Sequence, residues 1–160
     1  MQHSVVKKSE SLRACEANAL QHEIREAHGA MQSCFREMER VLASSSFDAG
    51  ALTLVRLKLA SIRLTRGPLI MRVAEVLAGN VTDEESAMLE QLRASHRRLL
   101  QTATAHTSKW TLDAIAADWP GYRRETRDLM RNWMDKAERE QRLVHPLVRR
   151  CAEPAMRSHW

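Results

Sequence analysis

The sequence has little glycine, proline or cysteine and few aromatic residues. Among 160 residues there are five glycines, four prolines and three cysteines, and aromatic residues make up 4%. Ala, Leu, Arg, Glu and Met outnumber the β-branched residues Val, Ile and Thr, a composition that favours helices over strands. We therefore expect an all-α protein.

The three cysteines, Cys15, Cys34 and Cys151, do not form a recognisable framework. Their number is odd, and neither a Cys-x-x-Cys motif nor the Cys/His spacing of a zinc ribbon is present. We therefore expect no disulfide scaffold and predict that the three side chains are buried or idle thiols.

The sequence also lacks a long apolar run. Residues 1–8 contain two lysines without an apolar stretch behind them, so we expect neither a signal peptide nor a membrane-spanning segment. Hydrophobic residues make up 44% and charged residues 28%, a balance that excludes a disordered tail. A chain of this length buries roughly two-thirds of its unfolded surface. We predict one cytoplasmic domain with a hydrophobic core and no membrane contact.

The net charge of +5 is a small excess in a chain with 25 basic and 20 acidic residues. Residues 1–50 and 81–120 carry a slight negative charge, whereas residues 51–80 and 121–160 carry a positive one. Charges of opposite sign would therefore compensate one another between neighbouring helices. Because no helix-turn-helix pattern or aromatic platform accompanies the basic residues, nucleic-acid binding is not favoured.

Four long segments follow the helical period and three short stretches interrupt them, which is typical of an antiparallel up-and-down four-helix bundle. The first helix is expected from about Ser11 to Ala43, after a flexible N-terminal segment of residues 1–10. The bundle domain is predicted over residues 11–150, with a loose C-terminal tail at 151–160. One face of the first helix carries residues spaced by three and four, namely Leu20, Ile24, His28, Met31, Phe35, Met38 and Leu42.

The second helix has clear start and stop signals. Asp48 is predicted to be its N-cap, and Phe47 is placed to pack against Leu52 as a hydrophobic staple. The helix is expected to run to about Leu77, where Ala-Gly-Asn at 78–80 provides the stop.

The third helix is predicted to begin after Thr82, which has the spacing of a capping box with Glu85, and to end near His106. Residues 107–118 leave room for a short extra turn, and Pro120 fits the first turn of the fourth helix. The buried faces are expected to carry Met88, Leu92, His96, Leu99 and Ala103 on the third helix, and Tyr122, Thr126, Leu129, Trp133, Lys136, Glu140, Val144 and Leu147 on the fourth.

Polar side chains interrupt these apolar faces near the middle of each helix. All four helices would thus direct a polar group to a similar level, which is how helical bundles form metal and cofactor sites. Alternatively, the long cations are boundary residues whose stems cover the core, and the histidines are satisfied core residues. The residues concerned are His28, His96, Lys136 and Glu140, with Arg63 and Arg66 on the second helix.

His28 and His96 lie in the middle of the first and third predicted helices, and Glu140 precedes Pro146 on the fourth. Over most of the chain this arrangement resembles the hemerythrin-like (HHE) four-helix bundles. That family has a single His on the first and third helices and His-x-x-x-Glu on the second and fourth, with a Pro after the last Glu. The resemblance implies a hemerythrin-like bundle in which His28, His96 and Glu140 match metal ligands, and iron would be the cofactor of such a site.

Most of the family's other ligands are replaced. Lys136 stands where the fourth helix of the family has its His, and Arg63 and Gly67 stand about where the second helix has its His and Glu. Pro68 removes the hydrogen bond to the carbonyl of Leu64, which predicts a helix kink at Gly67 and Pro68.

These replacements suggest how a bundle without metal could remain stable. Lys136 and Arg63 would supply the positive charge that a di-iron centre otherwise provides, and either could pair with Glu140. His28 and His96 would then be hydrogen-bonding partners in a core charge cluster. Because these cations would repel a divalent metal unless Lys136 lost its proton, we expect no cofactor.

No Gly-rich phosphate loop, nucleophile elbow or His-Glu-x-x-His motif is present, so we do not expect an enzyme. The first hypothesis is a diverged hemerythrin-like bundle that serves as an interaction or regulatory module, with an unknown protein partner and room for a homodimer. A second is residual metal or oxygen binding by His28, His96 and Glu140. A third is a small anionic ligand in the bundle core, held by Arg63 or Lys136 beside an apolar wall of Trp133, which on the simpler interpretation is a core residue.

Overall fold

A computed structural model describes the backbone of residues 2–77 and 79–152, and the side-chain environments of residues 15–77 and 79–151. In these ranges the chain forms five helices and no strand, which confirms the all-α prediction. The helices are α1 (Gln2–Ala43), α2 (Ala49–Leu77), α3 (Asp83–Lys109), α4 (Leu112–Ala117) and α5 (Trp119–Ala152).

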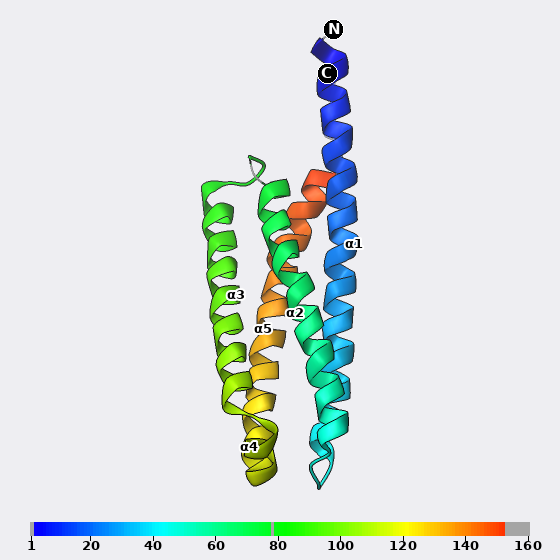
Figure 1. Ribbon diagram of the computed structural model, residues 1–160. Helices are drawn as coiled ribbons and strands as arrows, with labels where there is room; N and C mark the ends of the chain where they lie inside the picture. Colours follow the sequence, from blue (N-terminus) through cyan, green and yellow to red (C-terminus); the bar gives the residue numbers. More distant parts are fainter. Residues whose placement is uncertain (1, 78, 153–160) are drawn as a thin grey trace.

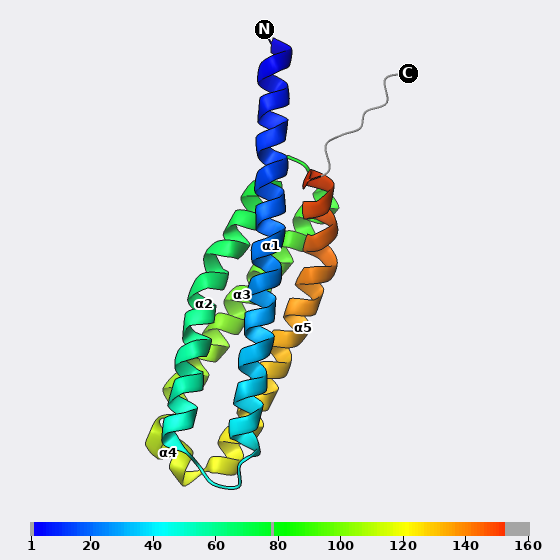
Figure 2. The ribbon, with the colours of Figure 1, turned by 90° about the vertical axis from the view of Figure 1, so that its right-hand side faces the viewer.

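The four long helices lie side by side, and the short α4 is found at the end where α3 is followed by α5 (Figure 1). The first turns of α1 extend beyond the ends of the other helices (Figure 2). α1 packs closely against both α2 and α5, and α3 packs mainly against α5. The backbones of α2 and α3, in contrast, approach each other closely at few points, although side chains of both helices belong to one apolar cluster.

The helix ends follow the capping signals of the sequence. The Asp48 carboxylate accepts a hydrogen bond from the Ala51 amide at 3.0 Å, as expected of an N-cap. Thr82 and Glu85 form the predicted capping box. Gly79 has φ of 77° after the last residue of α2, a conformation that favours glycine at a helix C-terminus.

Two boundaries of the helices differ from the sequence prediction. α1 begins at Gln2 rather than near Ser11, so residues 2–10 continue the helix instead of forming a separate segment. This stretch contains no glycine or proline that would end a helix. α5 continues to Ala152, and the remainder of the predicted tail, residues 153–160, lies outside the described residues.

The buried faces of the helices match the predicted spacing with one correction on α3. Met88 is 42% exposed, and its neighbour Leu89 is buried instead. Leu89 lies three residues before Leu92, so it continues the three-and-four spacing that places side chains on one helix face. The short extra turn after α3 is present as α4, capped by Thr111, whose side chain accepts a hydrogen bond from the Ala114 amide.

Several smaller expectations can be placed in the fold. In the described part of the chain the three cysteines are free, with Cys34 buried, Cys151 partly buried and Cys15 exposed. α2 continues through Gly67 and Pro68 to Leu77, and the kink there stays a prediction. No helix of the described chain is both long enough and apolar enough to cross a membrane.

Candidate functional site

A layer of buried polar side chains lies between two apolar clusters. One cluster includes Phe35, Met38 and Tyr122, and the other includes Leu20 and Val148. Between them, each long helix contributes at least one polar residue that is at least nine-tenths buried. We call this set the polar layer; its members are His28 from α1, Arg66 from α2, His96 from α3, and Lys136 and Glu140 from α5.

Glu140 is the centre of the polar layer. One guanidinium nitrogen of Arg66, Nη2, donates hydrogen bonds to both carboxylate oxygens of Glu140, at 3.1 and 3.0 Å. The Lys136 ammonium, one turn earlier on α5, donates to Oε2 of the same carboxylate. Lys136 is only 1% exposed and Glu140 only 6%. Two cations on different helices thus share one buried carboxylate.

The charges of the polar layer depend on one another. Burial alone would raise the pKa of Glu140, but Arg66 and Lys136 outweigh it and hold this pKa below its usual value. Burial lowers the pKa of Lys136, and Glu140 partly offsets that effect. The carboxylate is therefore ionised at neutral pH because the two cations are beside it.

His96 is buried beside the ion pairs without a hydrogen bond. It is 5% exposed, and neither ring nitrogen has a partner among the described residues. Its ring meets the Trp133 ring edge-on, with centroids 5.6 Å apart and an interplanar angle of 83°. Burial first, and then the charge of Lys136, lower the His96 pKa to about 4. The imidazole is therefore neutral near pH 7.

Two further histidines are His28 on α1, which belongs to the polar layer, and His145 on α5, which lies beside it. The ring nitrogen Nε2 of His28 is hydrogen-bonded to the Gln32 amide nitrogen at 2.8 Å. Burial and then the charge of Arg66 lower the pKa of His28, and burial also lowers that of His145. Nε2 of His145 is buried without a hydrogen bond in the described part of the chain. These imidazoles are also neutral at pH 7.

The structure brings Arg66, not Arg63, to Glu140. A series of buried or core-packed residues runs along α2 at spacings of three and four and includes Arg66, which is 3% exposed, whereas Arg63 is only partly buried. Arg63 lines a pocket instead. The predicted core cluster therefore needs one correction, since its second-helix cation is Arg66. The α2 series is Leu52, Val55, Leu59, Ile62, Arg66, Leu69, Val73 and Leu77.

The polar layer does not fit a metal ion well. The carboxylate of Glu140 is already bonded to two cations, which would repel a divalent metal. Among the described residues, no group of three or more His, Cys, Asp or Glu side chains is arranged to hold a metal. His28, His96 and Glu140 therefore face one layer of the core without forming a ligand set.

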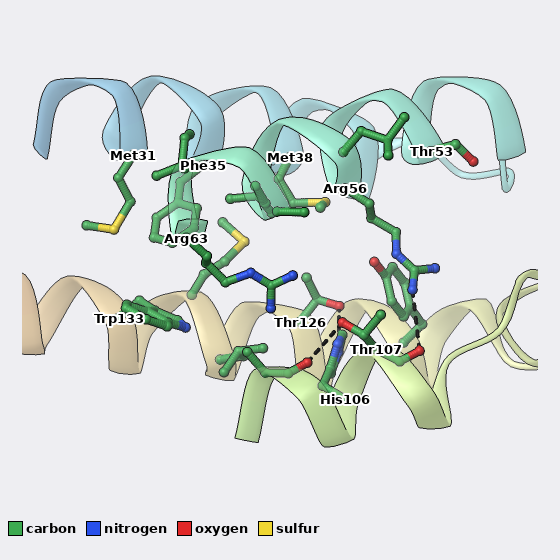
Figure 3. A pocket seen from close by; sticks show the side chains of 18 of the residues that line it. Met31, Phe35, Met38, Thr53, Arg56, Arg63, His106, Thr107, Thr126 and Trp133 are labelled. Atoms are coloured by element: carbon green, nitrogen blue, oxygen red, sulfur yellow. Dashed lines mark hydrogen bonds between the residues drawn. The ribbon is translucent and has the colours of Figure 1, made fainter. Parts of the chain in front are cut away.

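A pocket of about 380 Å³ lies next to the polar layer and is mostly lined by apolar side chains (Figure 3). Arg66 and Trp133 contribute to both the pocket and the surroundings of the polar layer. A volume of this size falls within the range of small-molecule sites in proteins. We call it the α2–α3 pocket; its apolar walls include Met31, Phe35 and Met38 from α1, and Leu129, Met130 and Trp133 from α5.

The pocket opens between α2 and α3, the two neighbouring helices that approach each other least. Leu57 on α2 and Leu112 on α4 both line it, and they are 63% and 43% exposed, which places them at its mouth. Arg56 bridges the gap near the end of α3, where it donates to the Trp110 carbonyl at 3.1 Å and the Thr107 carbonyl at 3.5 Å. A small molecule could thus enter without disrupting a closely packed helix pair.

The α2–α3 pocket contains a few polar groups. Arg63 extends from α2 across it toward Thr126 (Figure 3). The Thr126 hydroxyl is hydrogen-bonded to Nε2 of His106 at 3.1 Å. Burial is the main cause of a lowered pKa for His106, so this imidazole is neutral at pH 7. None of the described residues that line the pocket carries a carboxylate.

Comparison of the chain with family models, with curated proteins and with solved structures finds no match. The resemblance to hemerythrin-like bundles therefore stays a prediction from His28, His96 and Glu140.

His106 is a functional residue that sequence reasoning missed, and it could have been found by extending the helical spacing, because it continues the α3 series after Leu99 and Ala103. Arg66 was already named among the polar residues of the second helix. No single segment indicated the position of the pocket, because its walls come from several helices; Arg63 and Trp133, which were expected beside a core ligand, both line it.

Proposed function

We propose that this protein is a non-enzymatic binding module that receives a small, largely apolar molecule in the α2–α3 pocket. Its scaffold would be an antiparallel up-and-down four-helix bundle of the hemerythrin-like kind, and ligand occupancy would regulate a protein partner not yet identified. The observation that carries the proposal is an open, apolar-walled pocket of about 380 Å³ within a helical core. Cores normally contain few voids larger than a water molecule, so an accessible volume of this size favours a ligand.

The polar lining supports binding over catalysis. Thr126 and His106 form a hydroxyl–imidazole pair, but no lining carboxylate is present to orient the imidazole as a general base. Arg56 is bonded to main-chain carbonyls. The homodimer and the cytoplasmic location expected from the sequence stay predictions.

We expect the neutral fluorescent probe N-phenyl-1-naphthylamine to bind this pocket. Its emission should rise and saturate with wild-type protein because the apolar walls exclude water from the dye. Ala60 lines the pocket and is only partly buried, so Ala60→Trp should fill the space without disturbing the core and abolish most of the signal. Fluorescence titration measures both.

The matched control is Ala105→Trp, at an exposed position on α3 outside the pocket lining. It should titrate like the wild type. A signal that survives Ala60→Trp, or that is lost equally in both variants, would place the dye elsewhere and contradict the proposed function.

We further propose that the polar layer replaces, rather than holds, a di-iron centre. Arg66 and Lys136 neutralise Glu140 where a hemerythrin-like site would place metal. Protein purified from iron-supplemented cells should therefore carry only substoichiometric iron by elemental analysis and show no charge-transfer band. Stoichiometric iron that is lost in His96→Ala would instead support the residual metal site of His28, His96 and Glu140.

A further inference from the structure

The cations of the core differ in whether they are paired. Arg66 and Lys136 share Glu140, and Arg56 is bonded to two carbonyl oxygens at the end of α3. Arg63 has no hydrogen bond or ion pair to any described residue, although its side chain is partly buried. Partial removal of a guanidinium from water is unfavourable when no protein acceptor replaces the lost hydration. Among the described arginines that line the α2–α3 pocket, Arg63 is therefore the one whose guanidinium has no hydrogen-bond or ion-pair partner.

The neighbours of Arg63 make this charge less favourable still. Burial, followed by the positive charge of Arg56, lowers the pKa of Arg63, although a guanidinium remains charged at neutral pH. Because no Asp or Glu lines the pocket, the missing negative charge cannot come from its walls. An anionic group in the pocket would supply it.

From this charge imbalance we infer that the ligand of the α2–α3 pocket is an amphipathic monocarboxylate, with its acid group at Arg63 and its apolar body along the walls. This inference rests on the function proposed above and adds the chemical class of the ligand. A planar guanidinium donates two parallel hydrogen bonds to a carboxylate, and Arg63 is the lining arginine whose donors have no acceptor among the described residues.

The surroundings of Arg63 suit such a head group. Its guanidinium points toward Thr126, whose hydroxyl offers a further polar contact beside the neutral His106 (Figure 3). The walls beyond are apolar: Phe35 and Met38 belong to one buried cluster with Trp133. The pocket thus has polar groups at one place and apolar walls elsewhere. An aliphatic or aromatic acid has the same distribution of polar and apolar groups.

Octanoate and octan-1-ol test this inference because they share one alkyl chain and differ in charge. Isothermal titration at pH 7.5 should show wild-type protein binding octanoate at least about tenfold more tightly than octan-1-ol. Arg63→Met should reduce that ratio to about one while leaving the affinity for octan-1-ol unchanged. Arg63→Lys, which keeps the charge but loses the planar fork, should retain part of the preference.

Arg36→Met is the matched control, because it also removes one positive charge but at an exposed position of α1 outside the pocket. It should keep the wild-type ratio. Equal binding of the two ligands by wild-type protein, or a preference that survives Arg63→Met, would contradict the assignment of a carboxylate to Arg63. It would not contradict the pocket as a binding site. Binding of neither ligand, together with no N-phenyl-1-naphthylamine signal, would overturn the pocket as well.

Discussion

Replacing Glu140 with glutamine is expected to lower the free energy of unfolding by about 3–5 kcal/mol. The side chain keeps its size, but its negative charge is lost, and the ammonium of Lys136 and the guanidinium of Arg66 are left buried without a counter-charge. An unpaired buried cation forfeits its hydration without compensation. Urea denaturation followed by circular dichroism at pH 7 measures the difference.

Glu138→Gln provides the control on the same helix. Glu138 is bonded to Arg142 one turn later, and both side chains are largely exposed. Surface pairs of this kind contribute about 0–1 kcal/mol, so the control should be close to the wild type. If the two variants were equally stable, the charges of the polar layer would have to reach water, and its description as a buried ion-pair network would be wrong.

The polar layer is therefore easily damaged, but this does not mean that it adds net stability. A buried ion pair can often be replaced by well-packed apolar residues with no loss, because desolvation of both charges offsets their attraction. Apolar side chains at these positions would simply have joined the two apolar clusters into one. A gain in stability therefore does not by itself explain the charged layer in the middle of the core.

The polar layer also adjoins the α2–α3 pocket. Arg66 lines the pocket and holds Glu140, while Trp133 lines the pocket and packs edge-on against His96. A ligand that displaced either side chain would alter the network on the other side. The structure therefore contains a physical connection through which occupancy of the pocket could affect α3 and α5.

How far the sequence could predict this structure depended on whether a feature was local. The Thr82–Glu85 capping box and the Gly79 stop involve only neighbouring residues, and both are present. Burial of Lys136 and Glu140 also followed from their spacing on one helix. The level of the polar layer was predictable for the same reason, since His28 and His96 lie mid-helix on strongly patterned faces.

Features that depend on pairs of helices were harder to predict. α2 is apolar around much of its circumference, with exposed Leu54 and Leu64 as well as buried Leu52, so its pattern did not show which arginine faces the core. Arg63 was expected beside Glu140 because it stands about where the second helix of the hemerythrin-like family has its His, whereas Arg66 is found there. The pocket required knowledge that α2 and α3 separate, which is a property of the packed helices and of no single segment.

Acidification should destabilise the protein through His96. Its pKa is about 4 in the folded chain, against an ordinary value of 6.5. Between these two pH values the unfolded chain binds a proton at this imidazole and the folded chain does not. The contribution of His96 to the free energy of unfolding is fully present above pH 6.5 and decreases as the pH falls toward 4. The total loss is about 3 kcal/mol. Between pH 7.5 and 5.0, His96 should account for a loss of about 2 kcal/mol in the free energy of unfolding.

The His96→Leu variant isolates this contribution from those of His28, His106 and His145, whose pKa values are also lowered. Leucine cannot take up a proton beside Lys136 and Arg66, so urea denaturation of this variant should show a correspondingly smaller loss between the two pH values. Substitution of the exposed His22 by leucine should leave the wild-type loss unchanged. If His96→Leu lost as much stability as the wild type, then the imidazole must be able to accept its proton within the fold. Glu140 would then have to stabilise the imidazolium more strongly than burial, Lys136 and Arg66 together oppose it, and the balance described for the polar layer would be wrong.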